Sequence, residues 1–372
     1  MRSLANTLRL TGKELRAIRG DLVMVALIIY VFTVATYLVA DAVSTEIRNL
    51  SVAVIDEDQS ILSQRLTDAI QPPLFNSPVP VSPTEAEKAL IAGKYVLVVA
   101  LPPNLERDLR LGKSPTISIL VDATAVAHAG NGASYMQQLL TTEISRFVSP
   151  ENSGSSLVNV VFRNRFNPNL TSKWFSAVMQ LMNSITIITL ILSGASLIRE
   201  REHGTIEHVL VMPVRPHEIV LSKILANGVV ILAAATFSLE VVVRWMLGVP
   251  IAGSTLLFVG GTAIYIVAMA SIGLLLSTFT HNMGQFGLLI IPVMIVMILL
   301  SGGMTPLESM PLWLQLVMKT VSPSPHFVSF AQSVLYRGSG LSLVAGQLLI
   351  MAVMSAVALA ITLLRFRKVL SA

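Results

Sequence analysis

The segment from Arg199 to Lys223 carries most of the residue types that could do chemistry in this chain. Its histidines and glutamates are the types found in metal sites and in acid–base catalysis, namely His203, His208, His217, Glu200, Glu202, Glu207 and Glu218. His203 and His208 are five positions apart, which places them on different faces of a helix, whereas zinc-binding helices use a spacing of four. We therefore expect no metal site and no catalytic residue here.

A docking surface is the better interpretation of the same segment. Arg199–Val211 is predicted to form a short amphipathic helix, with Ile206, Val209 and Leu210 packed inward and the charges facing outward. Met212-Pro213 ends it, because a residue before proline disfavours helical geometry. The alternative is a solvated loop whose basic residues only orient the chain. The residues expected to contact a partner are Arg199, Glu200, Arg201, Glu202, His203, Gly204, Thr205, Glu207 and His208.

The composition requires a membrane around the elements that position this segment. The chain has 372 residues, of which 53% are hydrophobic and 13% charged, and its mean hydropathy is +0.72. Soluble domains carry about 25% charged residues. The net charge of +5 does not indicate nucleic acid, because the basic residues flank apolar runs, where they orient membrane spans. With no cysteine, disulfides and thiol nucleophiles are excluded.

The apolar runs predict an α-helical polytopic membrane protein with six transmembrane helices. Residues 1–20 form a basic amphipathic helix at the membrane surface, and residues 21–41 contain the first span. Residues 174–372 contain the other spans, at Trp174–Ile198, Ile224–Leu247, Thr255–Thr278, Gln285–Leu300 and Leu341–Leu364. Basic residues gather in residues 1–20, in 199–223 and at the C-terminus, whereas the opposite short segments hold only Lys319 and Arg337. Both termini are therefore expected in the cytoplasm.

Residues 42–173 differ from the rest and are predicted to form a periplasmic α/β domain inserted between the first two spans. Its strands are expected at Leu50–Asp56, Tyr95–Leu101, Pro115–Asp122 and Val158–Phe166. Its helices are expected at Ser60–Gln71, Thr84–Ala92, Asn104–Leu111 and Ala125–Val148, with Thr84 and Glu87 as a capping box. Strands that alternate with helices are typical of a layered α/β domain.

Three further features concern transport through or beside the spans. Polar residues along the second span and methionines of the fifth are candidates for a translocation path, although polar groups also bond between helices and methionine also faces lipid: Ser176, Gln180, Asn183, Thr186, Thr189, Met294 and Met297. Glu240 and Arg244 are spaced for an intramembrane ion pair with either a structural or a gating role. Within residues 302–340, Leu312–Val321 is an apolar helix too short to cross and is expected at the outer leaflet.

Several motifs identify a known family. The chain resembles the membrane subunit of type 2 ATP-binding-cassette exporters, in particular bacterial inner-membrane permeases of the YhhJ type. The strongest block is Leu197-Ile198-Arg199-Glu200-Arg201-Glu202-His203-Gly204-Thr205-Ile206-Glu207-His208 with Val211-Met212-Pro213. Arg165-Phe166-Asn167-Pro168-Asn169, Leu300-Ser301-Gly302-Gly303-Met304-Thr305-Pro306, Leu335-Tyr336-Arg337-Gly338 and Leu364-Arg365-Phe366-Arg367-Lys368 agree with it.

The resemblance implies how such a chain works. Residues 199–223 would hold a coupling helix against a nucleotide-binding subunit, which carries the ATP and Mg, so this chain would need no cofactor. Residues 1–20 would be a connecting helix. A second copy or a homologous permease would pair with this one, and a periplasmic membrane-fusion adaptor could join the assembly.

The expected function is therefore the permease half of an ATP-driven exporter of amphiphilic or hydrophobic substrates, drug-like or lipid-like, in a bacterial inner membrane. The chain itself would not be an enzyme. The alternative is a membrane receptor or scaffold whose periplasmic domain binds a ligand or an adaptor protein. An intramembrane hydrolase would need a catalytic pair in the spans, and the sequence offers none that convinces.

Overall fold

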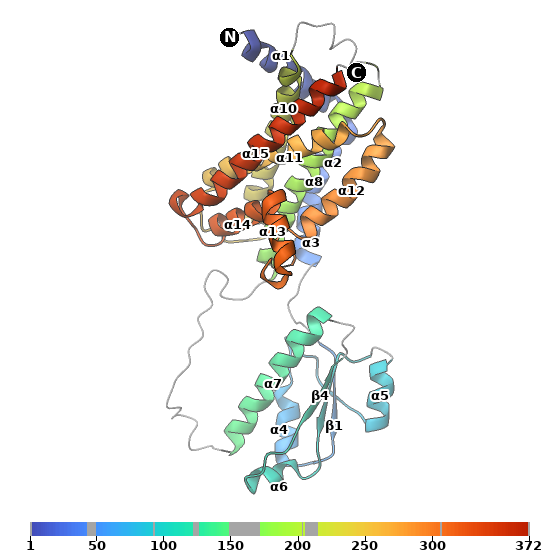
Figure 1. Ribbon diagram of the computed structural model, residues 1–372. Coiled ribbons are helices and arrows are strands. Elements are labelled where there is room, and N and C mark those ends of the chain that lie inside the picture. Colours follow the sequence, from blue (N-terminus) through green and yellow to red (C-terminus); the bar gives the residue numbers. More distant parts are fainter. Residues whose placement is uncertain are drawn as a thin grey trace. The chain divides into compact units, whose positions relative to one another are not determined.

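The computed structural model describes residues 2–42, 50–91, 94–121, 126–148, 172–202, 204, 215–305 and 307–370. The chain divides into two compact units, a helical unit of residues 1–43 and 165–372 and a second unit of residues 44–164. In the helical unit, the start of α1 and the end of α15 lie at the same end (Figure 1).

The helical unit is built around one central helix. Its N-terminal part is α1 (Arg2–Gly20), α2 (Leu22–Tyr30), the π-helical turn η1 (Val31–Ala35) and α3 (Thr36–Ala42). It continues with α8 (Ser172–Glu202), α10 (Pro216–Phe237), the π-helical η3 (Ser238–Met246), α11 (Thr255–Ser277), α12 (Met283–Leu299), the short 3₁₀ turn η4 (Leu307–Ser309), α13 (Leu312–Val321), α14 (Ser324–Leu335) and α15 (Leu341–Leu370). The spanning part of α8 is 83% buried, so the other helices surround it.

Within the described residues, five helices are long and apolar enough to cross a membrane. They are Leu22–Ala42, Lys173–Glu202, Pro216–Met246, Thr255–Ser277 and Leu341–Phe366. The predicted fifth span corresponds to α12, an apolar helix of 17 residues, which is shorter than the roughly 20 that a span needs. Beyond α12, Gly302 has a φ of +86°, a conformation that a helix cannot continue through. The structure thus supports a polytopic membrane protein with five candidate spans among the described residues, and the sixth predicted span, at α12, stays a prediction.

Two boundaries of the predicted charged segment are wrong. The second span does not stop at Ile198, since α8 continues to Glu202. The third does not begin at Ile224, since α10 begins at Pro216, where a proline at the first helical position is favourable. The charged residues on both sides of the connection are thus helix ends.

The segment after α12 contains one predicted helix and one that was missed. Helix α13 has the predicted bounds and exposes Leu312, Trp313 and Leu316. Helix α14 has nine buried residues, among them Phe327 and Phe330. Serines and prolines are uncommon inside helices, so the sequence pattern did not indicate this core helix.

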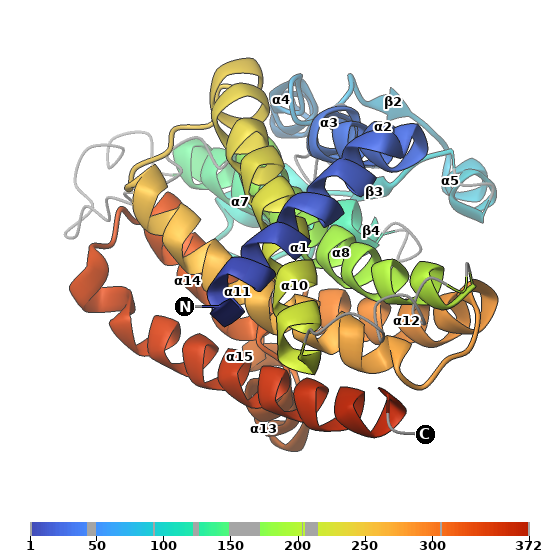
Figure 2. The same ribbon diagram turned by 90° about the horizontal axis from the view of Figure 1, so that it is seen from above.

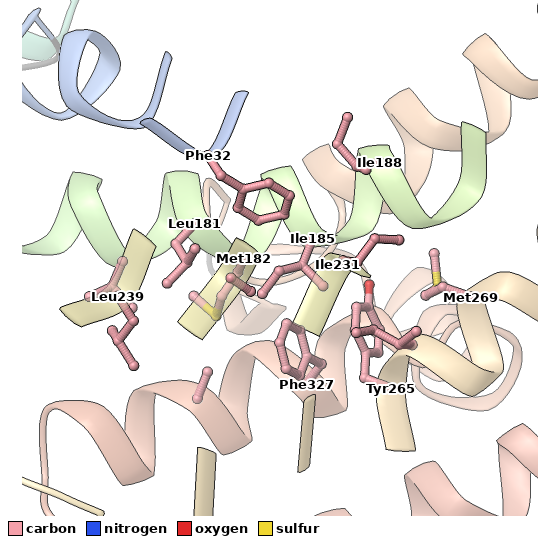
Figure 3. Close-up of a cluster of buried hydrophobic side chains, with 14 of the residues drawn as sticks. Phe32, Leu181, Met182, Ile185, Ile188, Ile231, Leu239, Tyr265, Met269 and Phe327 are labelled. Carbon is pink, nitrogen blue, oxygen red and sulfur yellow. The ribbon is translucent and has the colours of Figure 1, made fainter. Parts of the chain in front are cut away.

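The core of the helical unit is continuous across six elements. Figure 3 shows side chains of η1, α8, α10, η3, α11 and α14 in one cluster, with Tyr265 beside Phe327. These two rings stack with centroids 4.0 Å apart. At one point α8 and α11 touch through backbone, because a Cβ on Gly273 would lie 2.6 Å from the carbonyl oxygen of Leu190. Gly273 therefore sets the spacing of these two helices.

The second unit holds a four-stranded sheet with the order β2-β1-β3-β4. Its strands are β1 (Val52–Asp56), β2 (Val79–Pro80), β3 (Leu97–Leu101) and β4 (Ser118–Val121), and only β4 is antiparallel to its neighbour. The helices are α4 (Ile61–Ala69), α5 (Pro83–Ile91), α6 (Leu105–Arg110) and α7 (Val126–Val148). Alternate residues of β1 and β3 pack into two clusters on opposite faces of the sheet. The predicted strand at Val158–Phe166 lies outside the described residues.

The capping box of α5 begins two residues earlier than predicted. Ser82, not Thr84, accepts a hydrogen bond from the backbone N–H of Glu85, and the Glu85 carboxylate accepts from the backbone N–H of Ser82. Pro83 stands between them at the first helical position, which fixes the start of the helix.

Glu106 gives the second unit a pH-dependent contribution to stability. Hydrogen bonds from the Arg110 side chain (2.7 Å) and from the backbone N–H of Leu62 (3.1 Å) lower the pKa of its carboxyl. A lowered pKa stabilises the fold above the unfolded value of about 4.3, and this contribution disappears as pH falls through the folded value. We expect Glu106→Gln to lower the hydrogen-exchange protection factors of α4 and α6 at pH 7, and to reduce the loss of protection that wild type shows between pH 5 and 3. Glu57→Gln, at an exposed position, should follow wild type; equal profiles for both variants would contradict this.

Candidate functional site

The last turn of α8, Arg199–Glu202, is bonded to four other parts of the helical unit. This turn and the groups that bind it, on α1, the start of α2, α10 and the α11–α12 connection, are called the α8 junction below. Figure 2 shows α1 crossing α10 at this end of the unit. We take the α8 junction as the candidate functional site. Its ion pairs join residues up to 209 positions apart and so connect several helices at one place.

Lys223 is the centre of the junction. Its side chain is 1% exposed, and its ammonium group lies 2.9 Å from Glu200 Oε2 and 3.1 Å from Glu14 Oε1. It also donates to the carbonyl oxygen of Ser196 at 3.3 Å. Lys13, which is half exposed, approaches the other oxygen of Glu200 at 3.6 Å. A buried ammonium with two carboxylates is strongly held only while both partners stay. This cluster therefore joins α1, α8 and α10 as one piece.

Asp21 connects the start of α2 to the same turn. Its Oδ1 accepts the backbone N–H of Met24 and so caps α2, while its Oδ2 pairs with Arg199 at 2.7 Å. Asp21 could have been recognised from the sequence, since an aspartate directly before an apolar run is a typical N-cap. Glu14 had a signal too, because it is the one acidic residue in the basic segment 1–20.

The other two charges of the turn reach toward α12. The Arg201 guanidinium donates to the carbonyl oxygens of Thr280 (3.0 Å) and Ser277 (3.4 Å) at the end of α11. The Glu202 carboxylate accepts the backbone N–H of Met283 at 2.8 Å, which is the first residue of α12. Negative charge at the start of a helix is stabilising. The turn thus holds both ends of the α11–α12 connection.

Helix α1 has a second attachment to α10. Ser3 and His217 share a hydrogen bond of 3.3 Å, and Asn6 donates to Glu218 at 3.5 Å. Glu218 also accepts the backbone N–H of Arg215, the residue that precedes α10. Helix α1 is therefore bonded to α10 near its start, through Ser3 and Asn6, and again at Glu14.

The structure corrects the predicted orientation of the charges from Arg199 to Glu202. They were expected to face outward on a new helix over Arg199–Val211, but they belong to α8 and bond within the chain. Gly204 has a φ of +67°, which ends helical geometry after Glu202. The other predicted contact residues, His203, Thr205, Glu207 and His208, lie outside the described residues.

The candidate path residues of α8 do not form one lining. Thr186 is buried and bonds to Tyr265 at 2.7 Å, and Thr189 is buried and donates to the carbonyl oxygen of Ile185. Partly buried positions are held by Ser176, Gln180, Asn183 and Met294, and Met297 is buried. For Thr186 the bond to α11 favours the role of an interhelical contact. None of the seven lines either of the two cavities described here.

Tyr265 supplies a testable interhelical contact that the sequence did not indicate. Its hydroxyl bonds to Thr186 and, at 3.1 Å, to Ser324, so it joins α8, α11 and α14. We expect Tyr265→Phe to destabilise the solubilised chain by about 1 kcal/mol, as is usual for such bonds in membrane proteins. Thermal unfolding would measure this. Thr186→Val should add nothing in the Tyr265→Phe background; additive losses would contradict a shared bond.

Glu240 and Arg244 form an ion pair of 3.0 Å in η3. Thr255, at the start of α11, donates to the other oxygen of Glu240 at 2.6 Å. The pair is partly exposed, and its contact to Thr255 ties η3 to the next helix. Both the structural and the gating interpretations remain compatible with this geometry.

Described residues of the helical unit line the following two cavities. One, of about 460 Å³, lies inside the α8 junction, between α1, α8 and α10. The other, of about 420 Å³, lies at the start of α8, against the Ser301-Gly302-Gly303 turn and α14. Its lining includes Arg337 and Gln332.

Comparison with known proteins agrees with the motifs. Residues 21–364 match the model of the ABC-2 family transporter proteins. The inner membrane transport permease YhhJ of Escherichia coli K12 is 42% identical over 369 residues, which cover 99% of this chain and 98% of YhhJ, and so is YhhJ of Shigella flexneri. The probable multidrug ABC transporter permease YbhR of Escherichia coli K12 is 29% identical over 348 residues, 90% of this chain and 91% of YbhR.

These matches confirm the resemblance drawn from the motifs. They describe a multi-pass permease of the inner membrane, the transport subunit of an ABC system that has an ATP-binding partner. The chain belongs to the ABC-2 family of transporter proteins.

Proposed function

We propose that the chain is the permease subunit of an ATP-driven exporter of amphiphilic or hydrophobic compounds, drug-like or lipid-like. A separate nucleotide-binding subunit, which carries ATP and Mg, docks on residues 199–223. A second copy or a homologous permease completes the path, and both termini lie in the cytoplasm. The word multidrug in the name of YbhR supports the substrate class.

The observation that carries this proposal is the bonding of the α8 junction. A force applied beside Gly204 reaches α8 directly and reaches α1, α10 and α12 through charged contacts of 2.7–3.1 Å. The charges of Lys223, Glu200 and Glu14 are largely buried and resist separation, because each would lose its partner. This cluster therefore moves as a rigid group with α1, α8 and α10, and Glu202 carries a push from the partner on to α12.

The movement of substrate out of the inner membrane would follow from the rigidity of the α8 junction. Rotation of the junction would tilt α8, which is the most buried spanning helix, against the helices around it. A tilt there changes the space between two permease copies. The second unit, residues 44–164, is proposed to face the periplasm, where it could receive substrate or bind a membrane-fusion adaptor.

Deletion tests the docking site. We expect removal of residues 205–213, which follow the end of α8, to abolish co-purification of the nucleotide-binding subunit while the chain stays in the membrane. ATP-dependent uptake of ethidium into inside-out vesicles should disappear with it. The deletion leaves Arg199–Glu202 in place, so the junction itself is kept.

A deletion of similar length in residues 149–156, on the predicted opposite side of the membrane, is the matched control and should retain the ATPase. Retention of the ATPase by the 205–213 deletion would refute the docking site. If wild type retained the ATPase but showed no ATP-dependent uptake of ethidium, the proposed substrate class would be refuted. The proposed docking site would be unaffected by that result.

A further inference from the structure

The cavity in the α8 junction has polar and apolar walls. Its charged lining comes from Lys13, Glu14, Arg199 and Glu200, and Asn227 of α10 contributes an amide. The apolar wall is made by Ala17, Ile18 and Met24, from α1 and α2. A volume of about 460 Å³ is in the range of small-molecule sites. The cavity can therefore hold a group that is itself part polar and part apolar.

Asn227 shows that the site needs a hydrogen-bond acceptor. The residue is 2% exposed, and its side-chain nitrogen has no hydrogen-bond partner within the described part of the chain. Buried polar groups are almost always hydrogen-bonded, because an unpaired one loses its water without compensation. An amide nitrogen can only donate. An oxygen of a bound group would satisfy it.

The charges around the cavity select a ligand that carries both signs. Lys13, Arg199 and Lys223 are balanced by Glu14, Glu200 and Asp21 in the bonded network. A net anion or cation would upset this balance. A zwitterion keeps it, with its anionic oxygens toward Lys13, Arg199 and Asn227 and its cationic end toward Glu14. An ammonium joined to a phosphate is such a group.

The position of the cavity indicates that this group belongs to a lipid. Asp21 marks the point where the charged helix α1 ends and the apolar helix α2 begins. Directly after it, Leu22 and Val23 are 81% and 80% exposed, so an apolar outer surface starts at the level of the cavity. This is the level at which phospholipid head groups meet acyl chains.

We propose that the cavity between α1, α8 and α10 binds the head group of a zwitterionic phospholipid of the phosphatidylethanolamine type. The phosphate accepts from Asn227 and pairs with Lys13 or Arg199, and the ammonium pairs with Glu14. The acyl chains follow the apolar wall past Met24. A lipid held there fixes α1 against α8 and so completes the junction. The inference requires neither the partner subunit nor transport.

Native mass spectrometry of the delipidated full-length chain tests it. The probes are short-chain phosphatidylethanolamine, short-chain phosphatidylglycerol, and free phosphoethanolamine. We expect one phosphatidylethanolamine to bind at least tenfold more tightly than phosphatidylglycerol, and more tightly than the free head group. Asn227→Leu, which keeps the side-chain volume but removes the donor, should weaken its binding roughly tenfold.

Ala17→Phe is the second variant, because it fills the cavity from an exposed position of α1 without removing any bond, so its folding is not at risk. It should also weaken binding about tenfold, whereas Ala5→Phe on the same helix and Thr236→Val on α10 should bind as wild type does. Equal binding of both lipids, or wild-type binding by both cavity variants, would overturn the proposal. Equal binding of free phosphoethanolamine would overturn the lipid as the source. Because no nucleotide is present, each outcome is independent of the proposed export.

Discussion

Replacing Lys223 with methionine is expected to cost about 3–5 kcal/mol of the stability of the helical unit. The lysine is 1% exposed and holds Glu14 and Glu200, so its loss removes the buried cation of two largely buried carboxylates and leaves Glu200 only the half-exposed Lys13. The thermal unfolding of the solubilised chain would fall markedly. We also expect α1 to detach, which limited proteolysis within residues 2–20 would report.

Lys13→Met is the matched control, since Lys13 pairs with the same Glu200 but is 49% exposed and lies 3.6 Å away. Exposed pairs contribute only about 0–1 kcal/mol. The double variant Lys223→Met with Glu200→Gln should recover part of the lost stability, because one unpaired charge has been removed. Equal losses for Lys13→Met and Lys223→Met would show that burial of the cluster is not what makes it important.

Replacing Gly273 with valine is expected to separate α8 from α11. The added Cβ would lie 2.6 Å from the carbonyl oxygen of Leu190 and 3.3 Å from its carbonyl carbon, and these are backbone atoms that no rotamer change can move. Overpacking typically costs about 1–3 kcal/mol, and here the strain falls on the most buried helix. We expect loss of a monodisperse species on size exclusion and a lower unfolding temperature.

Gly260 provides the control on the same helix, because a Cβ there meets no atom within 4 Å. Gly260→Ala should be neutral or slightly stabilising, by up to about 1 kcal/mol, since alanine is the better helix former. If Gly273→Ala behaved as Gly260→Ala does, the close approach of the two helices would not determine the packing of the unit.

Periodicity alone predicted much of the fold of this protein. The apolar runs located the span formed by α2, η1 and α3, the helices α11, α12 and α13, and the start of α15 to within a few residues, because hydrophobic burial in a membrane or a core follows local pattern. The strands β1, β3 and β4 and the helices between them were predicted for the same reason. The motif block beginning at Leu197 identified the family, because it is a continuous stretch of sequence.

The contacts of the charged residues could not be predicted in this way. A helical pattern assigned Arg199–Glu202 to an outward face, but their partners Lys13, Asp21, Lys223 and Met283 come from four other elements. Pairing between different helices depends on how those helices pack, and no local period encodes it. The start of α10 was also not predicted. Glu218 and Lys223 are charged, so the sequence pattern assigned them to a solvated loop, whereas in the structure both are buried and paired.

The sequence by itself therefore determined the class of protein, most of its apolar helices and the segment expected to receive the partner. Only the tertiary structure decided that the charged end of α8 is bonded to α1, α2, α10 and the α11–α12 connection. It also decided that this junction lines an open cavity with the unpaired donor of Asn227. The physical reason is that hydrophobic burial produces a local spacing of apolar residues, which the sequence shows directly. The partner of a buried charge depends instead on how distant helices pack.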